Sequence, residues 1–176
     1  MSRTVVRSKA TPLRIRQYLP KDHRRVVRLW RDSGLGISHS DTVREIERTR
    51  RRDPDLFLVA EEEGVLVGVV LGRFDGRRGW VNHLAIDRRA RGLGLGVALM
   101  AELERRLVRK GCPKINLQVE PANEAVTGFY ERLGYRRRPM IFMERWMRGA
   151  PRRPPTPRPR ARPSAGKRRP RRVRTD

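Results

Sequence analysis

The residues best suited to chemistry form a glycine-rich loop between a predicted strand ending at Ile86 and a predicted helix starting near Gly94. Every second position of this loop is a glycine, at Gly92, Gly94 and Gly96. Glycine permits backbone angles that a side chain would forbid and lets a ligand approach the main chain closely. The first N–H groups of the helix have no partner within it, and the helix dipole favours an anion there. With Arg91 at its entrance, the loop predicts a binding site for a pyrophosphate group.

Two common nucleotide-binding patterns do not fit this loop. It lacks the Gly-Lys-Ser/Thr of a P-loop. It also lacks the third glycine of the dinucleotide fingerprint, because Gly96 is followed by Ala98 and Leu99, and the preceding segments indicate hairpins and not a parallel crossover. For the loop taken alone, an ordinary glycine-rich turn at the start of a helix is the alternative.

Two motifs, in order along the chain, resemble one enzyme family. Residues 91–96 (RGLGLG) resemble the R/Q-x-x-G-x-G/A signature with which GNAT acetyltransferases hold the pyrophosphate of acetyl-CoA. Residues 84–86 (LAI) resemble the family's splayed fourth strand, and residues 123–135 (NEAVTGFYERLGY) resemble its N-x-x-A-x-x-F-Y-E-x-L-G-F/Y helix. The resemblance spans roughly residues 13–146 and is greatest to the small bacterial RimI-like and YpeA-like members. The RimI-like members acetylate the N-termini of ribosomal proteins.

The resemblance implies a role for individual residues. Tyr130 would be the general acid that protonates the departing CoA thiolate. A phenol can do this because it keeps its proton at neutral pH. The alternative for Tyr130 is a core aromatic residue with its hydroxyl at the rim. Asn123 would cap the helix and touch the cofactor arm, although a plain N-cap explains it nearly as well. The implied acetyl-CoA-binding residues are Leu84, Ala85, Ile86, Arg91, Gly92, Leu93, Gly94, Leu95, Gly96, Val97, Asn123 and Tyr130.

A general base is not evident in the sequence. The positions that carry one in relatives correspond to Gln118 on the fifth strand and to Trp80 and Asn82 on the fourth, none of which is basic. Strict alternation puts His83 on the opposite face of the fourth strand, unless a β-bulge re-aims it. Glu120, at the end of the fifth strand, is the second catalytic candidate. Because an α-amine has a pKa near 7.7–8.0 and a lysine amine near 10.4, the missing base favours an α-amine or another weakly basic acceptor.

The hydrophobic pattern predicts the elements that position these residues. Strands are predicted over residues 13–18, 56–61, 65–73, 80–86 and 114–119, with two more short strands within 135–146. Helices are predicted over residues 22–30, from 41 to just before 53, from 94 to the stop at Gly111 and Pro113, and over 123–133. This order predicts an α/β domain of the GNAT fold, a splayed mixed sheet of six to seven strands with helices on both faces.

The chain has 176 residues and a formal charge of +24, of which residues 149–176 carry eleven positive and one negative charge, about +10. That Pro/Arg-rich segment cannot bury a core and is predicted to be a disordered basic tail. Residues 1–12 are predicted to be a basic N-terminal extension, and residues 13–148 the folded domain. Such a charge attracts polyanions, although an arginine-rich composition is equally explained as a compositional habit of the genome.

Further features limit the classes of function. The single cysteine, Cys112, excludes an intramolecular disulfide. With no apolar run of membrane length and no signal sequence, we expect a cytoplasmic protein without membrane contact and without a metal. Two hypotheses remain. One is an acetyl-CoA-dependent N-acetyltransferase that acts on a protein N-terminus or a small-molecule amine. The other is a ribosome- or nucleic-acid-associated module that binds acetyl-CoA with little turnover.

Overall fold

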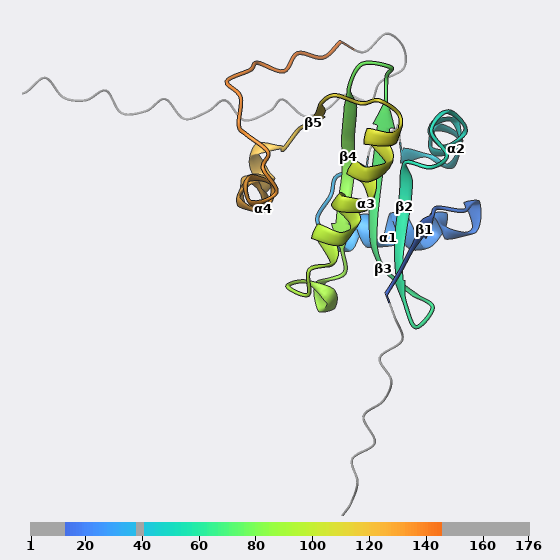
Figure 1. Cartoon of the computed structure of the whole chain (residues 1–176). Helices are drawn as coiled ribbons and strands as arrows, with labels where there is room; N and C mark the ends of the chain where they lie inside the picture. The colour runs from blue at the N-terminus through green and yellow to red at the C-terminus, as the bar shows by residue number, and fades with distance from the viewer. Residues whose placement is uncertain (1–12, 38–40, 146–176) are drawn as a thin grey trace, which may run out of the picture. The chain divides into compact units, whose positions relative to one another are not determined.

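The computed structural model describes residues 13–37 and 41–145, and within residues 13–140 it contains one five-stranded sheet with strand order β1-β2-β3-β4-β5 (Figure 1). The strands are β1 (Arg14–Gln17), β2 (Phe57–Glu62), β3 (Val65–Phe74), β4 (Gly79–Ile86) and β5 (Ile115–Leu117). The first four pair antiparallel and β5 pairs parallel to β4. The predicted mixed sheet is therefore confirmed.

Between the strands, the described residues form α-helices and short 3₁₀ helices. The α-helices are α1 (His23–Asp32), α2 (Val43–Arg52), α3 (Leu95–Arg109) and α4 (Thr127–Arg132). The 3₁₀ helices are η1 (Pro20–Asp22), η3 (Arg88–Ala90) and η4 (Pro121–Val126). Gly111, with φ of 76°, follows the end of α3, as the predicted stop requires. None of the helices in residues 13–37 and 41–145 combines the length and apolar character needed to cross a membrane.

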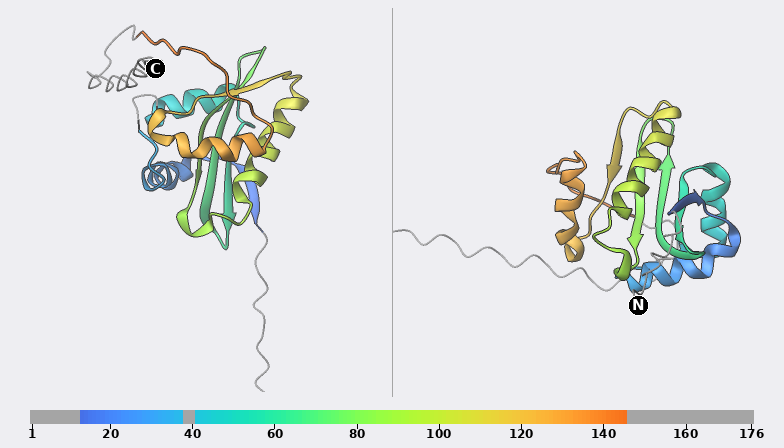
Figure 2. Two further views of the ribbon diagram at one scale, coloured as in Figure 1. Left: turned by 90° about the vertical axis from the view of Figure 1, so that its left-hand side faces the viewer. Right: turned by 60° about the horizontal axis from the view of Figure 1, so that its bottom comes forward.

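Helices cover both faces of the sheet, as predicted, and each face has its own core (Figure 2). The α3-side core joins α3 to Leu58 and Val70 of the central strands, whereas the α1-side core joins α1 and α2 to Val59 and Val69. Successive side chains of β2 thus enter opposite cores, which explains its unbroken apolar run. Helix α3 lies close to the sheet at Gly72, because a Cβ there would be 2.4 Å from the Leu103 Cδ1 atom.

The two strands predicted within residues 135–146 are absent from the residues that the structure describes up to 145, so the described sheet has five strands where six to seven were expected, a small difference that is compatible with the predicted fold. Residues 136–145 carry neither helix nor strand. Three consecutive arginines followed by Pro139 open this segment, and proline cannot donate a hydrogen bond to a neighbouring strand. The predicted tail over residues 149–176 and the extension over residues 1–12 lie outside the described residues.

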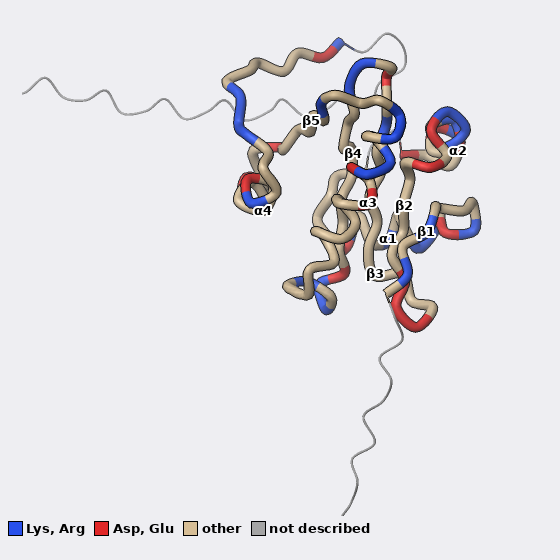
Figure 3. Tube along the Cα trace, viewed as in Figure 1, with Lys and Arg blue, Asp and Glu red and all other residues tan. Residues whose placement is uncertain are grey.

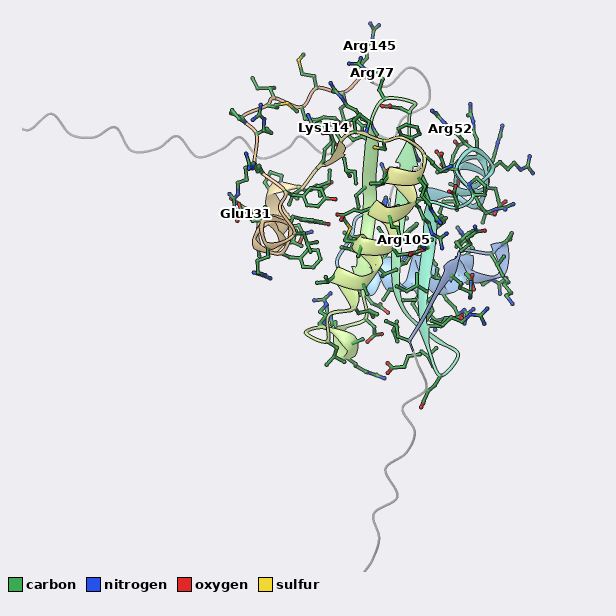
Figure 4. The ribbon with its side chains drawn as sticks, in the orientation of Figure 1. Arg52, Arg77, Arg105, Lys114, Glu131 and Arg145 are labelled. Atoms are coloured by element: carbon green, nitrogen blue, oxygen red, sulfur yellow. The ribbon has the colours of Figure 1, made fainter. Side chains whose placement is uncertain are left out.

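Basic residues are spread over much of the described surface (Figure 3). Arg52, Arg77 and Lys114 lie at the end of the sheet where β3 turns into β4 (Figure 4). Hydrogen bonds fix that end, because Arg52 Nη2 donates to the Phe74 carbonyl at 3.3 Å and the Gly79 N–H donates to the Lys114 carbonyl at 2.9 Å. Helix η3, at the opposite end of β4, is also basic. Positive charge at both ends attracts anions generally and does not by itself locate a site.

Candidate active site

The edge of β4 that faces β5 is paired only along its first part. The pairing of β4 with β5 ends at Val81 and Leu117, but β4 continues to Ile86 along β3. In the part of the chain that the structure describes, no strand pairs with the second edge of residues 82–86, which we call the open β4 edge. The main-chain groups of Leu84 and Ala85 lie in this stretch. Their placement fits the predicted splayed strand, on which an extended ligand could form main-chain hydrogen bonds.

The loop after β4 is organised by its own side chains. Asp87 caps η3 by accepting a hydrogen bond from the Arg89 N–H at 2.9 Å. The Arg91 Nε atom donates to the Ile86 carbonyl at 3.3 Å, so this exposed arginine is attached to the end of the strand. The loop therefore brings a fixed cation to the point where the open β4 edge meets the start of α3.

Two of the three loop glycines have left-handed backbone angles, with φ of 78° at Gly92 and 77° at Gly94. A Cβ at either position would meet nothing within 4 Å, so the space beside both is open. Gly94 is the N-cap residue of α3, and the helix has neither a side-chain cap nor an acidic residue in its first turn. Its first N–H groups are therefore left for an external acceptor. Leu93 and Val97 are exposed beside them, and the segment fits a diphosphate-bearing ligand such as acetyl-CoA.

Gly96, the third glycine, is needed for helix packing and not for left-handed backbone angles. A Cβ on Gly96 would lie 3.2 Å from the Phe129 Cζ atom, so this position lets α4 pack against the start of α3. Leu95, next to it, is buried in the α3-side core. The alternate spacing of glycines thus serves two purposes, backbone geometry at the first two positions and helix packing at the third. Tyr130 follows Phe129 on α4, the helix that packs there.

Tyr130 lies half-buried on α4 and packs against the α3-side core. Its ring makes edge-to-face contacts with Phe129 and Tyr135, with centroids 5.1 and 5.8 Å apart. The Tyr135 hydroxyl in turn donates to Glu104 Oε1 at 2.7 Å. Burial raises the pKa of Tyr130 to about 12, so the phenol keeps its proton throughout the neutral range. It can act as a hydrogen-bond donor to a group that becomes negatively charged.

The prediction that Asn123 caps the helix is wrong. Pro121, which favours the first turn of a helix, starts η4 two residues earlier. Asn123 lies exposed inside η4 with non-helical angles of −114° and 22°, and α4 begins only at Thr127. Glu120, the second catalytic candidate, is the exposed N-cap residue of η4.

A β-bulge in β4 changes the face on which His83 lies. Gly72 of β3 pairs with Val81, whereas the preceding residue, Leu71, pairs with His83, so that Asn82 is the extra residue. His83 therefore faces the α1 side of the sheet together with Leu71, and the strict alternation predicted for this strand is wrong. The sequence holds one signal of this, the two consecutive polar residues that interrupt the strand after Val81.

The rings of Trp30 and His83 are in contact on the α1 side, with centroids 4.6 Å apart and planes tilted by 33°. Trp30 is fully buried, and its ring packs against the His83 ring. The Nε2 atom of His83 is 3.6 Å from Oδ1 of Asp41, a buried carboxylate just before α2. Sequence reasoning did not select Asp41, because nothing in the chain pattern joins it to β4.

Comparison with known proteins agrees with this geometry. Residues 23–135 match the model of the acetyltransferase (GNAT) family. An acetyltransferase of Yersinia enterocolitica is 40% identical over 131 residues, 74% of this chain and 93% of that protein. One of Pectobacterium atrosepticum is 43% identical over 123 residues, 70% and 87% of the two chains. The chain belongs to the GNAT family. It is an acetyltransferase, and its acetyl donor is acetyl-CoA.

Solved structures share the fold. The crystal structure of Ard1 from Thermoplasma volcanium has a TM-score of 0.63 at 27% identity, covering 69% of this chain and 81% of that chain. The PaiA N-acetyltransferase of Thermoplasma acidophilum, solved in complex with coenzyme A, has a TM-score of 0.66 at 17% identity, covering 74% and 94%. The splayed five-stranded sheet described above is therefore an acetyltransferase fold.

The backbone at Gly94 offers a test of the donor site. We expect Gly94→Ala to raise the dissociation constant of coenzyme A about 10-fold, because a left-handed non-glycine residue costs roughly 1–2 kcal/mol and shifts the helix start. The matched control is Gly111→Ala at the other end of α3, where φ is 76° and the space is equally open. Titration calorimetry should show weakened binding only in the first variant. Equal affinities in the two variants would contradict the assignment.

Proposed function

We propose that the chain transfers the acetyl group of acetyl-CoA to a primary amine by direct transfer, with Tyr130 as the proton donor to the leaving sulfur. The observation that supports the proposal is a packing contact: a Cβ on Gly96 would lie 3.2 Å from the Phe129 Cζ atom, so α4, which carries Tyr130, packs against the first turn of α3. The helix start that would hold the diphosphate and the helix that carries the proposed proton donor are therefore in contact.

The proposed donor site consists of the loop and the open β4 edge. Backbone N–H groups at the start of α3 and the Arg91 guanidinium would neutralise the diphosphate, and the main chain of Leu84, Ala85 and Ile86 would align the pantetheine arm. Gly92, Leu93, Gly94, Leu95, Gly96 and Val97 form the turn and the first helical residues of this site. Acetyl-CoA supplies the activated thioester. The protein's part is to orient it and to exclude competing water.

Tyr130 would act mainly through a hydrogen bond. A phenol with a pKa of about 12 is a weaker acid than a thiol, whose reference pKa is near 8.5. Its hydroxyl would stabilise the charge that develops on sulfur as the carbon–sulfur bond breaks, and the proton would follow as that charge builds up. Asn123 and Glu120 are exposed near the start of η4, and we assign neither a step in the transfer.

Cys112 supports direct transfer over an acyl-enzyme route. It is the only cysteine of the chain, it is buried at 9% exposure, and its Sγ atom lies 3.2 Å from the Lys114 carbonyl oxygen. A covalent intermediate needs an accessible thiolate. We therefore propose that the amine attacks the thioester itself, with a protein N-terminus or a small-molecule amine as acceptor.

Acetyl-CoA labelled in its acetyl group tests the proposal. The purified full-length protein is incubated with label and cell extract, and the extract is then separated by size. We expect label in one amine-bearing fraction, and digestion of labelled protein distinguishes an α-amine from a lysine. Label in the small-molecule fraction would identify a metabolite acceptor. If acetyl-CoA binds and neither fraction gains label above a protein-free control, the proposed transfer is contradicted.

A further inference from the structure

Transfer to an amine releases a proton from the attacking nitrogen, so a proton acceptor beside the open β4 edge is chemically useful. A candidate must lie near the point where β4 and β5 part. His83 lies there. The last β4–β5 pair is Val81 with Leu117, and His83 follows after the single bulge residue Asn82.

Tyr130 and His83 lie on opposite faces of the sheet. The start of α3 and Tyr130 belong to the α3-side core. His83 projects to the other face, where its ring contacts Trp30 of α1 and its backbone pairs with Leu71 of the α1-side core. A donor held along the open β4 edge would therefore have Tyr130 on one side and His83 on the other. This is the arrangement in which a leaving sulfur and an attacking nitrogen meet different groups.

The surroundings of His83 favour one ring tautomer. The Asp41 carboxylate, 3.6 Å from Nε2, favours the proton on Nε2 and leaves the lone pair on Nδ1. The Nδ1 atom is buried and has no hydrogen-bond partner among residues 13–37 and 41–145. A buried acceptor that stays unpaired costs roughly 1–3 kcal/mol, so a substrate N–H that reached it would be bound favourably.

Burial is the main reason why the His83 ring is neutral near pH 7. Burial lowers the pKa of His83 below its ordinary value of 6.5; Asp41 opposes this shift, and Arg73 of β3 adds to it. Arg73 is itself held by a hydrogen bond of 3.0 Å from Nη2 to Thr49 Oγ1 on α2. From α1 the ring meets uncharged Trp30. A neutral imidazole is the form that can accept a proton.

We propose that His83 accepts the proton from the attacking nitrogen of the acceptor amine and that Asp41 is its positioning residue. This inference rests on the acetyl transfer proposed above. The neutral amine forms a bond from nitrogen to the acetyl carbon, one N–H proton passes to Nδ1 of His83, and the carbon–sulfur bond breaks. The sulfur takes its proton from Tyr130. The imidazolium then returns a proton through water to the Tyr130 phenolate, and no oxidant or further reactant is needed. Because Nδ1 is covered in the free protein, acceptor binding uncovers it or reaches it across one water molecule.

The full-length protein, labelled acetyl-CoA and the cell-extract fraction that accepts label provide the test. Initial rates are measured from about pH 5 to pH 9. We expect the wild type to lose activity on the acid side with a midpoint below the ordinary histidine value, as His83 becomes protonated. His83→Gln should lower the rate at neutral pH about 100-fold and abolish that acid limb, while the affinity for coenzyme A stays unchanged.

His23→Gln is the matched control. His23 is also half-buried, has an Nδ1 atom without a partner in the described residues, and has a pKa lowered by burial. It begins α1 and is not on β4. We expect this variant to keep the wild-type rate and acid limb. Asp41→Asn should move the acid limb to lower pH, because Asp41 raises the pKa of His83.

The outcomes separate the two proposals. If wild-type protein binds acetyl-CoA and labels nothing, acetyl transfer fails and the role of His83 fails with it. If the wild type is active and His83→Gln keeps the acid limb, whatever its rate, only the inference about His83 is overturned. Should His83→Gln not fold, the direction in which Asp41→Asn moves the acid limb decides. An unmoved limb counts against the inference.

Discussion

Replacement of Tyr130 by phenylalanine is expected to lower the rate of acetyl transfer about 1000-fold and to leave the affinity for coenzyme A unchanged. The change removes only the hydroxyl, while the ring keeps its edge-to-face contacts with Phe129 and Tyr135. The loss falls on the transition state, because charge on the departing sulfur develops only there. Steady-state rates with labelled acetyl-CoA and calorimetric titration of coenzyme A measure the two quantities separately.

Tyr135→Phe is the matched control for this experiment. Tyr135 is also half-buried, and its hydroxyl donates to Glu104 at 2.7 Å. Its loss should cost about 1 kcal/mol of stability and leave the transfer rate within a few-fold of wild type. A Tyr130→Phe enzyme that turns over at the Tyr135→Phe rate would remove Tyr130 from the chemistry and leave it as a packing residue.

Replacement of Asp22 by alanine is expected to lower the free energy of unfolding by about 3 kcal/mol. The Asp22 side chain is fully buried and accepts hydrogen bonds from Arg16 and Arg25, each at 2.6 Å, and from the Leu19 N–H at 2.9 Å. Its removal leaves the half-buried Arg16 with Glu61 as its one acidic partner among the residues that the structure describes. These contacts join β1 to the start of α1. Urea denaturation of Asp22→Ala beside Asp32→Ala, at the exposed end of α1, measures the effect.

The same carboxylate predicts a dependence of stability on pH. Burial alone would raise the pKa of Asp22, but the hydrogen bonds from Arg16, Leu19 and Arg25 outweigh it and lower the pKa from 3.8 to about 2. A group whose pKa is lower in the folded state stabilises the protein above its unfolded pKa. That contribution, about 2 kcal/mol, is lost as the pH falls from 3.8 toward about 2. Over this pH interval, the urea midpoint of unfolding should change less with pH in Asp22→Asn than in the wild type. An equal dependence on pH in the two proteins would contradict the prediction.

Local patterns in the sequence determined much of this protein. Glycines at alternate positions before an amphipathic run predicted the start of α3. They also predicted that the N–H groups of its first turn have no side-chain cap, because helix starts depend on a few neighbouring residues. Glu102 and Arg106, four residues apart, form an ion pair at 2.6 Å, since residues at this spacing are neighbours on a helix. The motif around Tyr130 placed that residue on a helix beside the sheet for the same local reason.

Other features depended on pairings between distant residues. The bulge at Asn82 arises from the register of β4 against β3, and a shift of one residue moves a side chain to the other face. That shift, together with the packing of α1, brings His83 to within 3.6 Å of Asp41, forty-two positions earlier in the chain.

The need for a glycine at position 96 also comes from the tertiary structure, because Phe129 of another helix packs against it. The sequence by itself predicted the class of fold from short-range backbone preferences, and the family resemblance of its two motifs indicated the proposed donor loop and the proposed acid. The tertiary structure decided which side chains face the α1 side of the sheet. Strand register and helix packing set those contacts, and they depend on residues that no local pattern connects.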